Sequence, residues 1–395
     1  MSDTDPFERL DALIAVGLRL ARSAPSGRVA LARAAAALHP AWLPRPWGDP
    51  IEAELRAAAT AAVTDPIAPR RVERVLRDAW GVPPADELDE LELEPVAVTP
   101  SSQVHRGVRA GNPVAIKLRR PGLDKATRQD LVLLERLSAP LAAAFPALDA
   151  GAILAEVRER VLDELDLEHE AAVQRRVHRA LRGHPFLTVP APVSSLARDG
   201  VLVSEWIDGV ALGQAPDADQ AAARLVAFVL GGLTAGIAHA DPDPDDVLVL
   251  ADGRLAILDF GASRTVDAPR AALTAAVFDA FAGEDAGALG DATAALGWLA
   301  ADRAPAALAL IRHALAELAG PSPSRLDVDA VTAVRERLLE APDELAALLR
   351  AGALGPQDLW PARSVAQAFG AIARVGATGS WVPLAQAALR DGWRA

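Results

Sequence analysis

The amino-acid sequence predicts an α+β fold in which β-hairpins come first and helices dominate the second half of the chain. Glycine-containing turns separate β-type runs at Gly111-Asn112, Asp199-Gly200 and Asp252-Gly253, and such residues tolerate the positive φ angles of tight hairpins. A helical pattern covers 151–183 between the first two hairpins, and helical periodicity resumes from Pro269 onward. Strands and helices in separate runs are typical of α+β domains.

Composition narrows the functional classes. The chain has 395 residues, 51% of them apolar, so it can build two ordinary domains or one bilobal enzyme. It has no cysteine, which excludes disulfides, thiolate metal sites and cysteine nucleophiles. A formal net charge of −13 opposes long-range attraction to phosphate backbones, so we expect no nucleic-acid partner.

The apolar segments predict no membrane span and no secretory leader. The first residues, MSDTDPFERLDALIAVG, carry acids and no basic stretch, and we expect a cytoplasmic protein. The most apolar span, 225–238, has 14 residues, whereas a membrane-crossing helix needs roughly 20. We interpret it as a buried core helix.

The first 85 residues have helical patterns, interrupted by the proline cluster PAWLPRPWGDP at 40–50. The acidic run DELDELELE at 86–94 follows. A solvated helix or strand edge explains this run better than a cation-binding surface does.

A lysine on the second predicted strand is the first candidate for chemistry. In VAIKLRR, Ile116 and Leu118 share one face of the strand and Lys117 points to the other, beside the small Ala115. Kinase-like sites place their phosphate-binding lysine on such a strand. The alternative, an outward lysine on a half-exposed strand, is common.

The helical segment 151–183 supplies acids in the run ELDLEHE. Asp166 and Glu170 are four residues apart, which places them on one face of the expected helix, and Glu164 lies just before them. Glu170 is the candidate partner that holds Lys117. An ordinary solvated helix face is the alternative for this run taken alone.

An acidic loop and a later Asp-Phe-Gly complete the pattern. In HADPDPDD, Asp241 and Asp246 are five positions apart, the spacing of the catalytic Asp and metal-binding Asn in protein-kinase loops. Asp259 follows a hairpin and begins Asp-Phe-Gly, whose Asp takes Mg²⁺ in kinases. In VLVSEWIDG, the backbone near Glu205 and Ile207 is placed to read adenine in an interlobe hinge.

These motifs together resemble the UbiB/AarF family of atypical kinases. The matching pieces are QVHRG at 103–107, VAIKLRRPG at 114–122, ELDLEHEA at 164–171, VLVSEWIDG at 201–209, HADPDPDD at 239–246 and LDFG at 258–261. The resemblance implies a bilobal protein-kinase-like fold. It divides the chain into a helical N-terminal extension (1–92), an N-lobe with the long helix (93–208), a C-lobe with the catalytic loop (209–330) and a helical tail (331–395).

The resemblance also implies roles for the site residues. Lys117 contacts the phosphates and pairs with Glu170, and Asp241 is the catalytic-loop acid. Metal ligands are Asp246 and Asp259. The family's Glu-x-Asp acids correspond to Glu164 and Asp166, near the nucleotide.

As cofactors the resemblance implies ATP and Mg²⁺, with Mn²⁺ as a substitute. Family members are associated with ubiquinone and isoprenoid-lipid biosynthesis, as ATPases or unorthodox kinases. The acceptor, whether protein, lipid or small molecule, is not identified by the sequence, and peripheral membrane contact stays open.

The chain also departs from the family pattern around the nucleotide. Pro100 and Ser102 stand in a loop that ends in glycine in the family, so we expect close backbone approach to phosphate to be hindered there. Ungapped matching puts Leu31 and Ala34 where the family's Lys-x-Gly-Gln signature has Lys and Gln. These departures favour the alternative of a decayed pseudokinase that binds nucleotide or partners without turnover.

The catalytic loop departs as well. Asp243, Asp245 and Asp246 replace the family's His, Gly and Asn, and aspartate remains a competent ligand for a hard cation. Four carboxylates in one loop repel a nucleotide without metal, so we expect nucleotide binding to depend strongly on the metal. A third possibility is a small-molecule kinase, which has a similar aspartate loop. The motifs ELDLEHEA and QVHRG in this chain argue against it.

Overall fold

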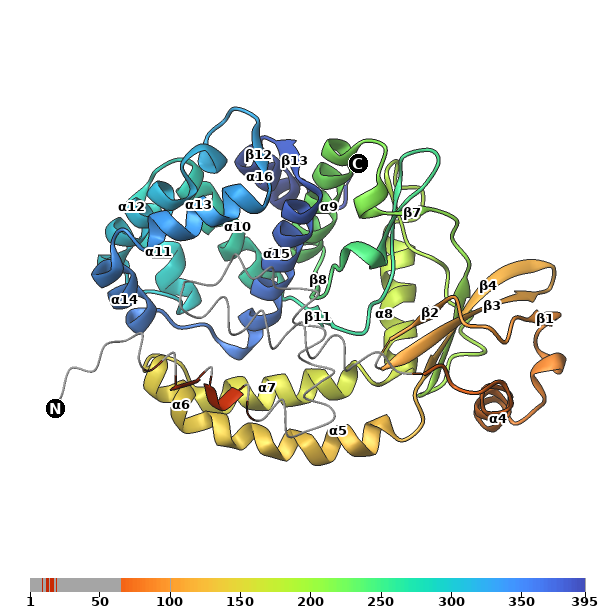
Figure 1. Cartoon of the computed structure of the whole chain (residues 1–395). Helices are drawn as coiled ribbons and strands as arrows, with labels where there is room; N and C mark the ends of the chain where they lie inside the picture. The colour runs from red at the N-terminus through yellow and green to blue at the C-terminus, as the bar shows by residue number, and fades with distance from the viewer. Residues whose placement is uncertain are drawn as a thin grey trace.

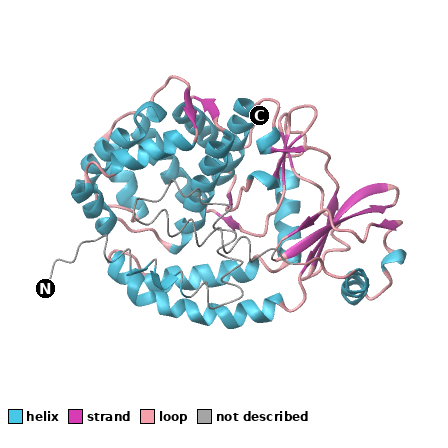
Figure 2. Ribbon diagram, viewed as in Figure 1, coloured by secondary structure: helices cyan, strands magenta, loops and turns pink. Residues whose placement is uncertain are grey.

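The computed structural model describes residues 65–99 and 101–394, with a few helical positions between residues 9 and 19. The proline cluster at 40–50, the positions Leu31 and Ala34, and Pro100 lie outside the described residues. A smaller lobe built on a sheet lies beside a larger lobe of helices (Figures 1 and 2). The predicted α+β class is confirmed. No described helix combines the length and apolarity that a bilayer crossing requires.

The small lobe contains a five-stranded antiparallel sheet with the path β1-β3-β4-β6, and β2 also pairs with β3. Its strands are β1 (Glu90–Leu91), β2 (Ala97–Val98), β3 (Ser102–Arg109), β4 (Asn112–Arg119) and β6 (Val201–Glu205). The pairing of Arg109 with Asn112 puts the first turn at Ala110-Gly111, one residue before the predicted position. Both turn residues have positive φ, 48° and 75°, as a two-residue hairpin requires. The acidic run contributes the edge strand β1.

The two faces of this sheet have different partners. Ile116 and Leu118 of β4 are fully buried in a cluster with Val72 and Leu76 of helix α4 (Pro69–Trp80). Because side chains alternate along a strand, Lys117 faces the other way, toward helix α8 (Leu167–Ala180). The predicted alternation is therefore observed, and it directs the lysine toward the large lobe.

The segment between β4 and β6 differs from the single long helix predicted. It contains α5 (Leu123–Leu131), α6 (Ser138–Ala144), α7 (Ala150–Asp163) and α8. The predicted helix is interrupted at Glu164–Asp166, so α7 runs beneath the large lobe and α8 lies beside the sheet (Figure 1). Asp166 causes the interruption, because its carboxylate accepts the backbone N–H groups of Glu168 (2.9 Å) and His169 (3.1 Å) as the N-cap of α8.

Helices form most of the large lobe. They are α9 (Ala218–Thr234), α10 (Ala268–Ala282), α11 (Ala286–Leu296), α12 (Ala304–Leu315), α13 (Val328–Leu338), α14 (Pro342–Ala351), α15 (Pro356–Val375) and α16 (Trp381–Asp391). Short strands accompany them, namely β5 (Leu187–Thr188), β7 (Val210–Ala211), β8 (Ile237–His239), β9 (Val247–Val249), β10 (Leu255–Ile257), β11 (Ser263–Thr265), β12 (Ser324–Leu326) and β13 (Ala377–Gly379). The helical pattern predicted from Pro269 is confirmed.

Two of the predicted turns lie between short paired segments. Arg198 and Val201 exchange backbone hydrogen bonds of 2.8 and 3.0 Å around Asp199-Gly200. Asp252-Gly253 joins β9 to β10, which pair antiparallel. Both turns therefore lie where the sequence predicted them, and the second brings the acidic loop next to the Asp-Phe-Gly segment.

Helix α9 is the centre of the large lobe, and the end of the chain covers it. It is buried, as predicted, although it ends at Thr234 and the last part of the predicted span forms β8. The Trp393 ring stacks on Phe228 with a centroid separation of 5.4 Å, and its Nε1–H donates to the Phe228 carbonyl at 2.8 Å. Gly231 permits this approach, because a Cβ there would lie 2.9 Å from the Gly392 backbone.

Candidate functional site

Lys117 is the central cation of the site. Its Nζ lies 2.9 Å from both carboxylate oxygens of Glu170 and 3.1 Å from Oδ2 of Asp259. The side chain is 17% exposed. Burial alone would lower the pKa of Lys117, but the charges of Asp259 and Glu170 outweigh burial and raise it above its ordinary value. The lysine is therefore a fixed, permanently charged group.

Glu170 lies on α8 and is the fixed point that positions Lys117. Its side chain is only 2% exposed, and its Oε1 also accepts the backbone N–H of Phe260 at 3.3 Å. Burial raises the pKa of Glu170, and the neighbouring Lys117 charge opposes that effect. One carboxylate thus connects the sheet lysine of the small lobe to the Asp-Phe-Gly segment of the large lobe.

The Asp-Phe-Gly segment has a constrained backbone. Asp259 has a φ of 49°, and its Oδ1 accepts the Gly261 N–H at 3.1 Å. His239, from β8, packs edge-on against Phe260 at 5.0 Å, and its Nε2–H donates to the Leu258 carbonyl at 3.1 Å. Burial lowers the pKa of His239, so the ring is neutral and serves as a support.

Asp246 lies beside this segment at the end of a 3₁₀ turn, η5 (Pro244–Asp246). The Leu258 N–H donates to the Asp246 carbonyl at 2.8 Å, which connects the acidic loop to the strand before Asp259. Burial raises the pKa of Asp246 well above its ordinary value, and the nearby Asp259 charge raises it further. Asp243 shapes the turn, because its carboxylate accepts the Asp245 N–H at 3.0 Å.

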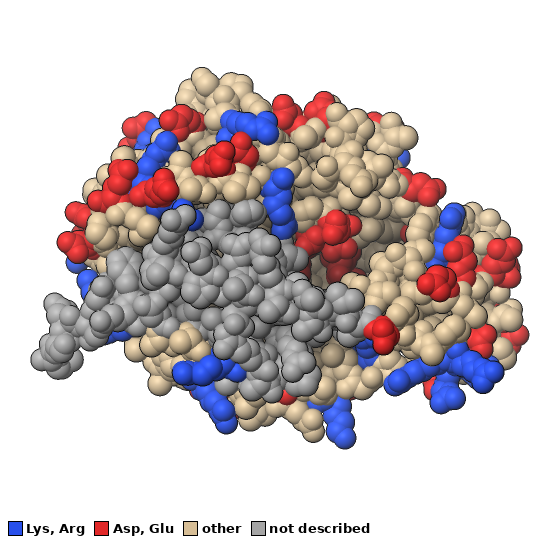
Figure 3. Space-filling model, viewed as in Figure 1, with Lys and Arg blue, Asp and Glu red and all other residues tan. Residues whose placement is uncertain are grey.

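These two aspartates fit a hard divalent cation that keeps other ligands. Repulsion between Asp246 and Asp259 would be relieved by a cation between them. Within the described part of the chain, no three acidic or histidine side chains gather to enclose a metal alone. Mg²⁺ is commonly held by one or two carboxylates together with water and substrate phosphates. Figure 3 shows acidic side chains gathered in a hollow between the lobes.

Arg363 of α15 is a site residue that the sequence did not predict. Its guanidinium lies 3.3 Å from Oδ1 of Asp241 and 3.9 Å from Oε1 of Glu164. It also lies 5.1 Å from the centroid of the Trp360 ring, whose Nε1–H donates to Glu156 of α7 at 3.0 Å. No motif spacing identifies this arginine, because only the tertiary fold brings α15 to the acidic loop.

Two predicted nucleotide residues have structural partners. Asp166 caps α8 as described above. Glu205 ends β6, where its backbone N–H donates to the Ala191 carbonyl at 2.9 Å. Ile207 lies between β6 and β7 in the connection from the small lobe to the large one. The hinge prediction therefore depends on groups other than the Glu205 N–H.

The loop that would cover the phosphates is a closed turn. The Thr99 hydroxyl accepts the backbone N–H groups of Ser101 (3.3 Å) and Ser102 (2.9 Å). Arg120 fixes the same turn, because its Nε–H donates to the Thr99 carbonyl at 2.9 Å. Backbone N–H groups of a phosphate-binding loop normally point at the ligand, whereas these two point at a side chain of their own turn.

The chain matches the sequence profile of a known protein family. The sequence profile of the ABC1 atypical kinase-like domain matches residues 62–292. The chain belongs to this family. The resemblance to UbiB/AarF proteins is thereby confirmed.

Relatives of the ABC1 chain occur in bacteria and plants. It is 31% identical to the uncharacterized protein slr0889 of Synechocystis over 211 residues, which is 48% of this chain and 52% of the relative. It is 29% identical to "Protein ACTIVITY OF BC1 COMPLEX KINASE 1, chloroplastic" of Arabidopsis thaliana, covering 47% and 29%. It is 26% identical to "Probable protein kinase UbiB" of Marinobacter nauticus, covering 50% and 39%. The chain thus spans about half or less of these relatives' length.

A solved structure shares the fold of the ABC1 chain. It is the Mycobacterium tuberculosis protein Rv3197 in complex with erythromycin, with a TM-score of 0.62, 24% identity and 87% coverage of both chains. This likeness supports the kinase-like fold.

Proposed function

We propose that this ABC1 chain binds Mg-ATP between its two lobes and hydrolyses it or transfers its phosphoryl group to an acceptor. The observation that carries the proposal is the position of Lys117, which is fixed between Glu170 of one element and Asp259 of another. Phosphoryl transfer depends mainly on positioning and charge neutralisation. A lysine fixed next to paired aspartates supplies the positioning that this reaction requires.

Each site residue has a proposed role. Lys117 contacts the phosphates, and Glu170 holds it in place. Asp246 and Asp259 would hold Mg²⁺ or Mn²⁺, which when bound offsets the phosphate charge. Asp241 faces the substrate as the catalytic-loop acid, with Arg363 limiting its repulsion of the nucleotide.

We further propose that nearby groups contribute to nucleotide binding. Glu164 and Asp166 lie at the α7–α8 junction, where Glu164 shares Arg363 with Asp241 of the acidic loop. The backbone near Ile207 and Glu205 reads adenine. A relative carries the name UbiB, so a link to isoprenoid-quinone metabolism is part of the proposal. The acceptor is a protein, a lipid or a small molecule, and the chain works in the cytoplasm with peripheral membrane contact as an option.

A pseudokinase is the second candidate function, and one observation favours it. Thr99 occupies the N–H groups of Ser101 and Ser102, so this turn offers the phosphates fewer donors than an open glycine loop does. Weak positioning of the phosphates would reduce turnover more than binding. In that case the chain acts as a nucleotide-binding or interaction module.

A thermal-shift panel with nucleotides and metals tests the proposal. Wild type is compared with Lys117→Met and with the matched control Lys125→Met, because Lys125 is exposed on α5. ATP and ADP are each tested with Mg²⁺, Mn²⁺ and excess chelator. We expect stabilisation only with metal, following RT ln(1 + [L]/Kd), that is lost in Lys117→Met and kept in Lys125→Met.

Phosphate release separates the two candidates. An active enzyme releases phosphate from Mg-ATP and loses that activity in Asp259→Asn. Stabilisation by Mg-ATP with the same phosphate release in wild type and Asp259→Asn supports the pseudokinase. Absence of any nucleotide-dependent stabilisation would contradict both the enzyme and a pseudokinase that binds nucleotide.

A further inference from the structure

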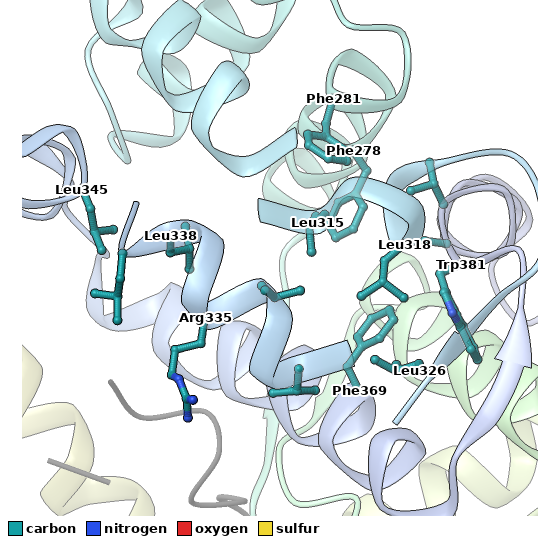
Figure 4. Close-up of a pocket in the computed structure, with 15 residues that line it drawn as sticks. Phe278, Phe281, Leu315, Leu318, Leu326, Arg335, Leu338, Leu345, Phe369 and Trp381 are labelled. Atoms are coloured by element: carbon teal, nitrogen blue, oxygen red, sulfur yellow. The ribbon is translucent and has the colours of Figure 1, made fainter. Parts of the chain in front are cut away.

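A second cavity lies in the large lobe, away from the acidic loop. Its volume is about 410 Å³, within the range of about 300–1,000 Å³ that is typical of small-molecule sites. Helices α10, α12, α13, α14, α15 and α16 contribute its walls, as Figure 4 shows. The side chains that line it are buried or half-buried in the described chain, so the cavity is a recess in the lobe.

The walls are apolar and rich in aromatic rings. Phe278, Phe281 and Phe369 line the cavity, so three of the chain's eight phenylalanines meet here. Trp381 adds a fourth ring, 6.3 Å from that of Phe369, and its indole N–H is already bonded to the Ser324 carbonyl at 3.0 Å. The cavity therefore offers aromatic and aliphatic surface with no hydrogen bond to be made by the indole.

The walls of this cavity carry little charge. Among the lining residues Arg335 is charged, and Figure 4 shows its guanidinium directed away from the ring cluster. Its Nη2 lies 3.8 Å from a carboxylate oxygen of Glu336, outside the cavity wall. A charged ligand seated among the rings would lose its hydration there without a compensating partner. The chemistry of the walls thus selects an uncharged ligand.

We propose that this cavity binds an uncharged, predominantly apolar small molecule. Protein interiors contain few voids larger than a water molecule, because wall atoms without neighbours lose dispersion contacts. An apolar molecule restores those contacts, whereas water finds no polar partners along these walls. The site is separate from the nucleotide site, so this proposal does not depend on the proposed function.

A protein partner fits the cavity less well than a small molecule does. Docking faces expose large apolar side chains. The exposed large hydrophobic residues of the described chain, such as Val132, Val210 and Ile311, are not among the residues that line this cavity. A small molecule can enter the recess and contact the rings, whereas the flat surface of a protein partner cannot.

Titration of the intact chain with Nile red, an uncharged apolar dye, tests the proposal. We expect saturable fluorescence enhancement with one site per chain. Val334→Trp places an indole in the cavity wall and should weaken dye binding at least tenfold. The matched control Ile311→Trp adds the same indole at an exposed position of α12 and should leave affinity within twofold. Lys117→Met should also retain the site.

Competition by soluble amphiphiles tests the ligand class without a substitution. We expect 1-dodecanol to displace the dye at least tenfold more effectively than dodecanoate, below the concentrations at which either aggregates. If Val334→Trp fails to fold, Leu338→Trp fills the same cavity from one turn further along α13. Non-saturable binding, equal affinity of Val334→Trp and Ile311→Trp, or equal competition by the two amphiphiles would each overturn the proposal.

Discussion

The pairing of Lys117 with Glu170 makes a quantitative prediction about stability. Glu170 is 2% exposed, and both of its oxygens lie 2.9 Å from Nζ. Lys117→Met leaves this buried carboxylate without its cation and next to Asp259, and breaking a buried pair in this way costs about 3–5 kcal/mol. Glu170→Gln keeps an acceptor for Lys117, which still has Asp259 at 3.1 Å, so it costs about 2 kcal/mol.

The double variant Lys117→Met/Glu170→Gln separates coupling from simple loss of contacts. Removing both charges leaves no buried Glu170 carboxylate without its cation, and only Asp259, whose side chain is 30% exposed, loses Lys117. The cost of the double variant should therefore be about 2–3 kcal/mol less than the sum of the single costs. Urea unfolding of nucleotide-free protein, followed by tryptophan fluorescence, measures the free energy of unfolding of wild type, the two single variants and the double variant. Lys125→Met is the control and should stay within about 0.5 kcal/mol of wild type. Additive single effects, or a Lys117→Met cost equal to that of the control, would refute the reasoning.

Two further substitutions test the acidic loop. The pKa of Asp246 is raised in the folded protein, so folded protein binds the proton more tightly and stability falls as pH rises from the unfolded pKa through the folded one. Without metal, Asp246→Asn should therefore be more stable than wild type at neutral pH, and the difference should vanish in acid. Thermal melting at several pH values measures this. A difference in melting temperature between the two proteins that does not change with pH would contradict the prediction. Arg363→Met removes the cation nearest Asp241 and should cost about 1 kcal/mol and weaken Mg-ATP binding several-fold. Arg390→Met, at a side chain that is 71% exposed, should change neither, and identical behaviour of the two arginine variants would count against the assignment.

The sequence was most informative where chemistry restricts the residue type. Strand alternation turned Lys117 away from the core, and motif order placed Glu170 and Asp259 after it. The structure brings these three side chains together. A further signal lay in composition, because the chain has only two lysines among 40 basic residues, and one of them is Lys117. A compact ammonium suits this narrow gap between two carboxylates better than a planar guanidinium does.

The features that the sequence did not predict depend on competition between local structural signals and on tertiary contacts. Helical periodicity continues through 164–166, so pattern alone predicted one helix, although Asp166 followed by two glutamates is also typical of a helix start. Arg363 could not be predicted, because α15 reaches the acidic loop only after the large lobe has assembled. The Thr99 turn was equally hidden, since its hydroxyl-to-backbone bonds depend on a backbone path that residue identities do not fix.

The covering of α9 by the last helix has a consequence for biosynthesis. Phe228 and Trp393 are 165 positions apart, and Thr234 bonds to the Leu389 carbonyl over 155 positions. A ribosome releases the first member of each pair long before the second, so the apolar surface of α9 stays uncovered while the remaining helices are made. Final assembly of this lobe must therefore follow synthesis of its last helix, and contacts of such long range favour slow folding.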